Sequence, residues 1–188
     1  MRITFILYQK GFDRLIGPLT WLSKSRLCIK SAIAKRSGHP LSAYTPANAF
    51  KIFYLDVGLL NAALDSPMEA IVQNKLESYK GFMVENFVAE ELFSQLGHDL
   101  VSWQEGESEI EFLVASGENI IPMEVKSGAK SRRAKSLAAY IQKYHPPFAY
   151  KVTSQNVGQN LGKSGANEKG GFLTLPLYLC SKIVKNHC

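Results

Sequence analysis

The most regular alternation of apolar and polar residues lies in two short runs, Glu109–Ala115 and Asn119–Lys126. A Ser-Gly-Glu-Asn turn joins the two runs, and this pattern predicts a β-hairpin. Because side chains alternate across a strand, the apolar residues of each run are expected to share one face and to point into a core. These residues are Ile110, Phe112 and Val114 in the first run, and Ile121, Met123 and Val125 in the second.

The opposite face of this predicted hairpin carries charge. Glu109 and Glu111 lie on it in the first strand, and Glu124 and Lys126 lie on it in the second. Carboxylates that are buried together are costly unless a cation neutralises them, and a lysine or a divalent metal with oxygen ligands would do so. The pattern therefore indicates a site built on a carboxylate pair and a lysine. The alternative is an ordinary surface hairpin with hydrated glutamates.

A helix is predicted over Gly81–Leu96, directly before the strands. Its apolar and small residues recur at helical spacing and form one stripe, which would face a core. Glu85 is the single charge on this stripe. A buried charge needs a partner, so we expect Glu85 to lie near the charged face of the hairpin. The residues of the stripe are Gly81, Phe82, Glu85, Val88, Ala89, Leu92 and Leu96.

The remaining pattern predicts an α/β fold. It indicates another strand before the hairpin, a helix after it and then two more strands: Asp99–Gln104, Ser131–Tyr144, Phe148–Ser154 and Gly171–Tyr178. Residues 81–188 are thus expected to form an α/β domain. Residues 1–80 are expected to form a helical appendage.

Within the expected appendage, a helix is predicted over Phe12–Leu27, and Phe50–Leu60 has the pattern of a strand that leads into a helix. Asp56 lies where that second helix would begin. Aspartate commonly caps helices, so we interpret Asp56 as a cap or turn residue and not as a metal ligand.

Composition narrows the class of protein. The chain has 188 residues, of which 46% are hydrophobic and 20% are charged, which is ordinary for a globular protein. Its three cysteines form no C-x-x-C pair, so neither a disulfide framework nor a zinc site is expected, and a reducing, cytoplasmic environment fits. No apolar run approaches the roughly 20 residues that a membrane span needs, so no membrane partner is expected.

The net charge of +6 is unevenly distributed. Residues 81–125 contain ten acidic residues and no Lys or Arg, whereas residues 126–167 contain eight Lys or Arg and no acid. Free backbone amides at the start of a helix favour anions, and basic side chains near that start add positive charge that attracts phosphate. DNA is therefore the expected partner. The alternative is two hydrated faces of opposite sign that dock on each other or on another protein. The predicted DNA contacts are Lys130, Arg132, Arg133 and Lys151.

The order of these charges resembles the core signature of the PD-(D/E)XK nuclease superfamily: an acidic residue at 111, then Glu124, one residue, and Lys126. The resemblance implies a restriction-endonuclease-like core in which carboxylates hold Mg²⁺ or Mn²⁺ and the lysine assists the attacking water. Carried over to this chain, the metal ligands would be Glu85, Glu111 and Glu124, and the catalytic residues would be Lys126, Glu124 and Glu111.

A longer set of motifs is similar to a prokaryotic family of AAA-type ATPases with a C-terminal domain of unknown function. The motifs are F-K-I-F-Y-L-D-V-G-L-L, G-F-M-V-E-N-F-V-A-E-E-L, S-E-I-E-F-L-V and I-I-P-M-E-V-K-S-G. The resemblance implies that the N-terminal appendage is part of a winged-helix-like region. This chain departs from the family at Glu111, where an aspartate is usual, so the metal geometry would differ by one methylene.

The sequence indicates no nucleotide-binding site in this chain. The segment Gly158–Ser164 has three residues between its glycines where a phosphate-binding loop requires four. We therefore expect no ATPase activity in this chain, and an AAA-type ATPase partner or self-association instead. Two functions are expected from the sequence. One is a metal-dependent DNA phosphodiester hydrolase, and the other is a catalytically silent nuclease fold that serves recognition or assembly of an ATPase.

Overall fold

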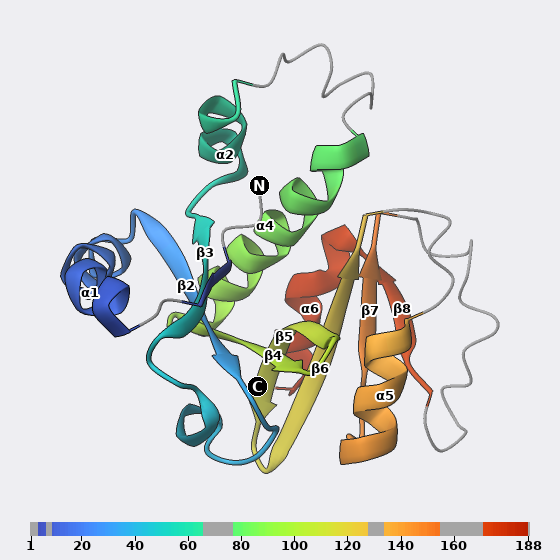
Figure 1. The fold of residues 1–188 in the computed structure, drawn as a ribbon. Helices are drawn as coiled ribbons and strands as arrows, with labels where there is room; N and C mark the ends of the chain where they lie inside the picture. The colour runs from blue at the N-terminus through green and yellow to red at the C-terminus, as the bar shows by residue number, and fades with distance from the viewer. Residues whose placement is uncertain (1–3, 7–8, 66–76, 128–133, 155–170, 188) are drawn as a thin grey trace.

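The fold was analysed in a computed structural model of the chain, which describes residues 4–6, 9–65, 77–127, 134–154 and 171–187. It is an α/β fold built on one mixed sheet, as the sequence predicts (Figure 1). Within the described residues the sheet has eight strands, in the order β1-β3-β2-β4-β5-β6-β7-β8. Their bounds are β1 Thr4–Ile6, β2 Cys28–Ala34, β3 Ala49–Tyr54, β4 Leu100–Glu105, β5 Ser108–Ser116, β6 Asn119–Lys126, β7 Tyr150–Thr153 and β8 Leu173–Pro176.

The centre of the sheet is the predicted meander β4–β5–β6, whose strands pair antiparallel. On one side β6 pairs with β7 in parallel, and β7 pairs with β8 in the same way. On the other side β4 pairs in parallel with β2, which in turn pairs antiparallel with β3. Parallel neighbours need crossover connections, and α4 and α5 lie in the connections that lead to β4 and β7.

Helices cover both faces of the sheet. The described helices are α1 Gln9–Lys24, α2 Val57–Ala63, α4 Glu77–Leu96, α5 Lys135–Tyr144 and α6 Cys180–His187, with 3₁₀ turns at Leu41–Tyr44 and Leu177–Leu179. Helices α4 and α6 contact each other on one face, and α5 packs on β5 and β6 from the other. In Figure 1 the red α6 lies behind β6, and the orange α5 lies in front of the sheet.

The buried apolar side chains form two clusters, one on each face. The α4-side core contains Val88 and Leu92 of α4 together with Phe112, Met123 and Val125 of the hairpin. The α5-side core contains a second set, Leu41, Trp103, Ile110, Leu113, Ala134, Leu137, Tyr140, Ile141 and Ala149. The predicted stripe of the Glu85 helix is therefore confirmed at Val88, Ala89 and Leu92, which are fully buried.

A bulge in β5 alters which side chains share a face. Val101 pairs with Leu113, whereas Trp103 pairs with Ile110, so β5 has one more residue than β4 between these two pairs. Alternation is interrupted there, and Ile110 packs in the α5-side core while Phe112 and Val114 pack in the α4-side core. The prediction that these three residues share one face is wrong, because no alternation rule anticipates an inserted residue.

The structure also corrects the expectation of a helical appendage over residues 1–80. This segment contains helices α1 and α2, but its strands β1, β2 and β3 extend the sheet of residues 81–188. The link is the parallel pairing of Ser31–Ala34 with Leu100–Trp103.

The start of α2 agrees with the interpretation of Asp56. Its carboxylate accepts hydrogen bonds from the amides of Gly58 at 2.6 Å and Leu59 at 3.2 Å, so Asp56 is an N-cap.

Among the helices that the structure describes, none is long and apolar enough to span a bilayer.

Candidate functional site

Strands β5 and β6 stop pairing through their backbones at Glu111. Their ladder runs from Ser116–Asn119 to Phe112–Met123, and beyond it the amide of Val125 donates to the Glu111 carboxylate at 3.1 Å. A side-chain oxygen thus replaces a main-chain acceptor, which keeps a buried amide satisfied where the strands separate. The bulge places Glu111 at this point of separation, so its carboxylate is fixed by the fold.

Lys126 joins the two predicted catalytic carboxylates. Its Nζ lies 2.9 Å from an oxygen of Glu124 and 3.4 Å from an oxygen of Glu111. The Lys126 side chain is 32% exposed, whereas the two carboxylates are almost completely buried. The structure therefore brings together the three residues that the sequence predicted, and the lysine is the member of the trio that solvent reaches.

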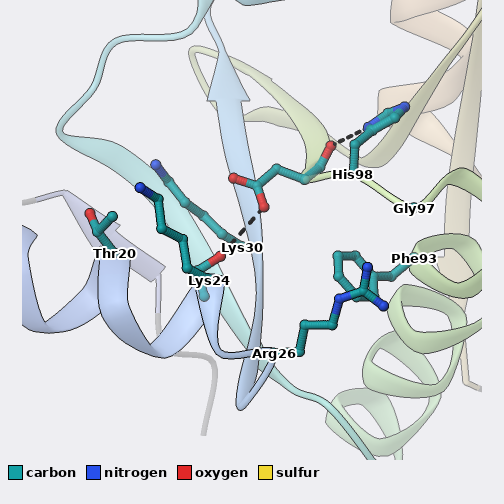
Figure 2. A pocket seen from close by; sticks show the side chains of 9 residues that line it. Thr20, Lys24, Arg26, Lys30, Phe93, Gly97 and His98 are labelled. Atoms are coloured by element: carbon teal, nitrogen blue, oxygen red, sulfur yellow. Dashed lines mark hydrogen bonds between the residues drawn. The ribbon is translucent and has the colours of Figure 1, made fainter.

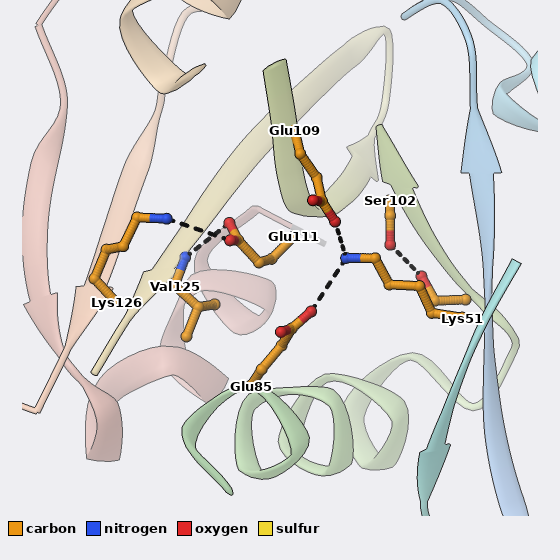
Figure 3. Close-up of polar contacts among 8 residues, drawn as sticks. Lys51, Glu85, Ser102, Glu109, Glu111, Val125 and Lys126 are labelled. Carbon is orange, nitrogen blue, oxygen red and sulfur yellow. Dashed lines mark hydrogen bonds and ion pairs between the residues drawn. The ribbon is translucent and has the colours of Figure 1, made fainter. Parts of the chain in front are cut away.

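A second lysine, which the sequence analysis missed, binds the other carboxylates. Lys51 of β3 places its Nζ 3.1 Å from Glu85 and 2.5 Å from Glu109, and it is only 2% exposed (Figure 3). Glu85 of α4 is thus paired with Lys51 of β3, and its charge also acts on Glu111. The signal for Lys51 was present in the sequence, since it is the one charged residue in the strand A-F-K-I-F-Y.

Two small serine side chains leave room for the Lys51 side chain to extend over the neighbouring strands. Strands β2 and β4 lie between β3 and β5, so the Lys51 and Glu109 side chains must meet over them. Ser31 of β2 is the register partner of Lys51, and its hydroxyl lies 2.7 Å from that of Ser102 in β4. Both serines are fully buried. Small side chains that satisfy each other therefore lie where larger ones would block the lysine.

Burial and charge oppose each other in this cluster, which comprises Glu85, Glu109, Glu111, Glu124, Lys51 and Lys126 and which we call the Glu–Lys cluster. Burial raises the pKa of the Glu111 carboxyl above its ordinary value; Lys126 partly offsets this effect and Glu85 adds to it. For Lys126, burial alone would lower the pKa, but Glu111 and Glu124 outweigh it and raise the pKa above the usual lysine value. Lys126 is therefore a cation at neutral pH, not a proton acceptor.

One carboxylate oxygen of Glu124 has no hydrogen-bond partner among the described residues. Its Oε1 binds Lys126, while Oε2 is buried and accepts no hydrogen bond within the described structure. A buried carboxylate oxygen without a partner is costly, and a bound cation would satisfy it. Oxygen donors are also the ligands that Mg²⁺ and Mn²⁺ prefer, so Glu124 together with Glu111 fits a divalent cation by donor type.

The predicted third ligand is differently engaged. Glu85 binds Lys51, and among the residues that the structure describes no group of three or more His, Cys, Asp or Glu side chains is arranged to hold a metal. A metal at this site would thus rest on Glu111 and Glu124, with Glu85 held by the lysine.

Of the four predicted DNA contacts, the structure describes one. Lys130, Arg132 and Arg133 lie outside the described residues, as does the segment Gly158–Ser164. Lys151 is described and is only 6% exposed, since β7 is flanked on both sides and Lys151 is in register with Glu124. Burial lowers the pKa of Lys151 below the usual lysine value. Lys151 therefore lies buried beside Glu124 and not on an open basic surface, and its contact with phosphate stays a prediction.

The fold and the cluster define the class of molecule: an α/β protein whose mixed sheet carries a buried site of glutamates and lysines. The chain belongs to the family described as a domain of unknown function, DUF4143, whose sequence model matches residues 80–177. No curated protein and no solved structure matches the chain. Five of the six charged residues of the Glu–Lys cluster lie within the match; Lys51 lies outside it.

Proposed function

We propose that this chain is a metal-dependent hydrolase of DNA phosphodiesters that uses Glu111, Glu124 and Lys126. The observation that carries the proposal is the unpartnered, buried Oε2 of Glu124, which lies in a carboxylate pair beside a solvent-accessible lysine. A carboxylate pair that holds a cation next to a fixed positive charge is an arrangement that catalyses phosphodiester hydrolysis. The resemblance of this arrangement to the PD-(D/E)XK signature supports the same function.

The carboxylates would hold Mg²⁺ or Mn²⁺. When bound, such a metal lowers the pKa of a water molecule and neutralises charge that develops on the phosphate. Glu111 is held in place by the Val125 amide and by Lys126, and Glu124 is held through one oxygen by Lys126. Both carboxylates are thus oriented before any ligand arrives, which reduces the cost of ordering them on binding.

Lys126 contributes charge. Because neighbouring carboxylates raise its pKa, it does not remove a proton from water at neutral pH. Its partly exposed side chain is instead suited to contact a phosphate oxygen of the substrate and to stabilise the negative charge of the transition state. Lys126 also neutralises part of the carboxylate charge that would repel DNA.

DNA is the proposed substrate because cations follow the site in the chain. Residues 126–167 contain eight Lys or Arg and no acid, and the whole chain carries a net charge of +6. Such an excess favours phosphate backbones without specifying a base sequence. We further propose, from the resemblance to the AAA-type ATPase family, that the domain works with an ATPase or through self-association.

The ion pairs of Lys51 favour a second function. With Lys51 bound to Glu85 and Glu109, and Lys126 bound to Glu111 and Glu124, every carboxylate of the cluster has a lysine partner without a metal, and the two lysines offset half of the carboxylate charge. In that case the cluster would tie β3, α4 and the hairpin together. The domain would then be a catalytically silent module for target recognition or for assembly of an ATPase.

Metal binding and cleavage, measured on the same variants, separate the two functions. Calorimetric titration with Mn²⁺ should show binding to wild type and to Glu118→Gln, a control in the exposed turn of the hairpin, but not to Glu124→Gln. Wild type should cleave plasmid or branched DNA with Mg²⁺ or Mn²⁺, and Lys126→Ala should not. If wild type and Lys126→Ala do not differ in cleavage under any of these conditions, the catalytic proposal fails and the silent module is favoured.

A further inference from the structure

A second site lies at one end of the sheet, away from the Glu–Lys cluster. It is a pocket of about 270 Å³ between the C-terminal ends of α1 and α4 and the beginning of β2 (Figure 2). Its lining is rich in cations and hydroxyl groups: Thr20, Ser23, Lys24, Arg26, Lys30, Phe93, Gly97, His98 and Asp99.

Positive charge dominates this pocket. Within the described part of the chain, no carboxylate forms an ion pair with Lys24, Arg26 or Lys30. Asp99 is the one acid in the lining, and it accepts a hydrogen bond from the Ser23 hydroxyl at 3.4 Å. Three positively charged side chains therefore line a concave surface that holds a single negative side chain.

Arg26 is held in place at the edge of the pocket. Its φ is 56°, in the left-handed region that residues other than glycine rarely adopt. This conformation ends α1, with the Arg26 amide donating to the Ser23 carbonyl at 3.1 Å. The guanidinium carbon lies 5.9 Å from the centre of the Phe93 ring. Figure 2 shows the two side chains next to each other. A cation–π contact of this kind leaves the N–H groups of a guanidinium available for hydrogen bonds.

The negative ends of two helices offset part of the positive charge in the pocket, but not all of it. Each helix C-terminus carries about half a negative charge, so α1 and α4 together contribute about one. Asp99 adds one more, against the three positive charges of Lys24, Arg26 and Lys30. A surplus of about one positive charge remains. Lys30 in particular lies on β2 and not at a helix end.

We propose that this pocket binds a phosphate group. Its volume is slightly below the roughly 300–1,000 Å³ of pockets that enclose a whole drug-sized ligand, so it fits a small anionic group. Arginine and lysine are the usual donors to phosphate, and the hydroxyl of Thr20 adds a neutral donor. Phe93 is eight residues beyond Glu85 on α4, about 12 Å along the helix, so the pocket is separate from the Glu–Lys cluster.

The test is titration with inorganic phosphate at low salt, followed by calorimetry and by NMR of the backbone amides. Wild type should bind, with the largest amide shifts at the residues that line the pocket. Arg26→Gly removes the guanidinium and relieves the left-handed backbone, so it should fold normally and weaken binding about tenfold. Lys30→Gln should act in the same direction. Lys182→Gln, which removes an exposed charge from α6, is the matched control and should leave binding unchanged.

A duplex DNA titration distinguishes the source of the phosphate. If Arg26→Gly and Lys30→Gln also reduce the salt dependence of DNA binding, by about 0.9 in slope for each phosphate that is no longer neutralised, the group belongs to a nucleic acid backbone. If they weaken phosphate binding but leave DNA binding unchanged, the group belongs to a small phosphorylated molecule. The proposal is overturned if wild type does not bind phosphate, or if Lys182→Gln weakens binding as much as Arg26→Gly does.

Discussion

Replacing Lys51 by methionine tests whether the buried lysine is essential to the fold. The substitution keeps the length and the apolar stem of the side chain but removes the charge that Glu85 and Glu109 share. Removing one partner of a buried ion pair costs about 3–5 kcal/mol, because the remaining charge is left unpaired in a poorly polarisable environment. The Glu85 side chain is 10% exposed and that of Glu109 is 23% exposed, so water can compensate for part of the loss at Glu109. We therefore expect Lys51→Met to lower the free energy of unfolding by about 3 kcal/mol.

The chain contains a matched control for this measurement. Lys143 and Glu105 form an ion pair whose side chains are 51% and 41% exposed. Exposed pairs of this kind contribute little to stability, so Lys143→Met should have little effect. Urea unfolding followed by circular dichroism gives both values, and the double variant Lys51→Met/Glu85→Gln should recover part of the loss. An equal, small effect of Lys51→Met and Lys143→Met would refute the reasoning.

Three further predictions concern stability. Because burial raises the pKa of Glu111 in the folded protein, ionisation of this carboxyl opposes folding. The protonated carboxyl stabilises the fold below the pKa of the unfolded chain, and this stabilisation is lost as the pH rises through the pKa of the folded protein. The free energy of unfolding of Glu111→Gln, measured with urea, should therefore rise relative to that of wild type between pH 4 and pH 7. If the difference does not change with pH, the electrostatic argument is wrong. Asp56→Ala should cost about 0.5–2 kcal/mol in the same assay, whereas Asp56→Asn should cost less because it keeps the cap. Ser102→Val removes the partner of Ser31 and narrows the path of Lys51, so it should cost about 1–3 kcal/mol, and no loss would show that the serine pair is dispensable.

The parts of the fold that the sequence predicted are those determined by local patterns. The strand Asn119–Lys126 has the predicted bounds because alternation, a turn and a strand break all agree there. The face of Glu85 followed from helical spacing alone, since its neighbours at that spacing are apolar. Ile110 was assigned to the wrong face because a one-residue bulge in β5 leaves no mark in the pattern of apolar positions.

The parts that could not be predicted depend on contacts between distant segments. The partner of Lys51 is fixed by the strand order β3-β2-β4-β5, and nothing near Lys51 in the sequence indicates that order. Strand β2 was missed for a related reason. Its partner β4 lies about seventy residues further on, and Lys30 and Ser31 interrupt its apolar residues. Burial of Lys151 also results from pairing across the sheet, with β6 and β8 on either side.

The parallel pairing of β2 with β4 has a practical consequence for how this domain is delimited. The family match covers residues 80–177, but a protein cut at those bounds would lose β2, and β4 would become an open edge able to pair with other molecules. It would also lose α6, whose Cys180, Ile183 and Val184 complete the α4-side core, and Lys51, which forms ion pairs with Glu85 and Glu109. The unit that folds is therefore larger than the unit that is recognisable by sequence, and a fragment limited to the match is expected to aggregate.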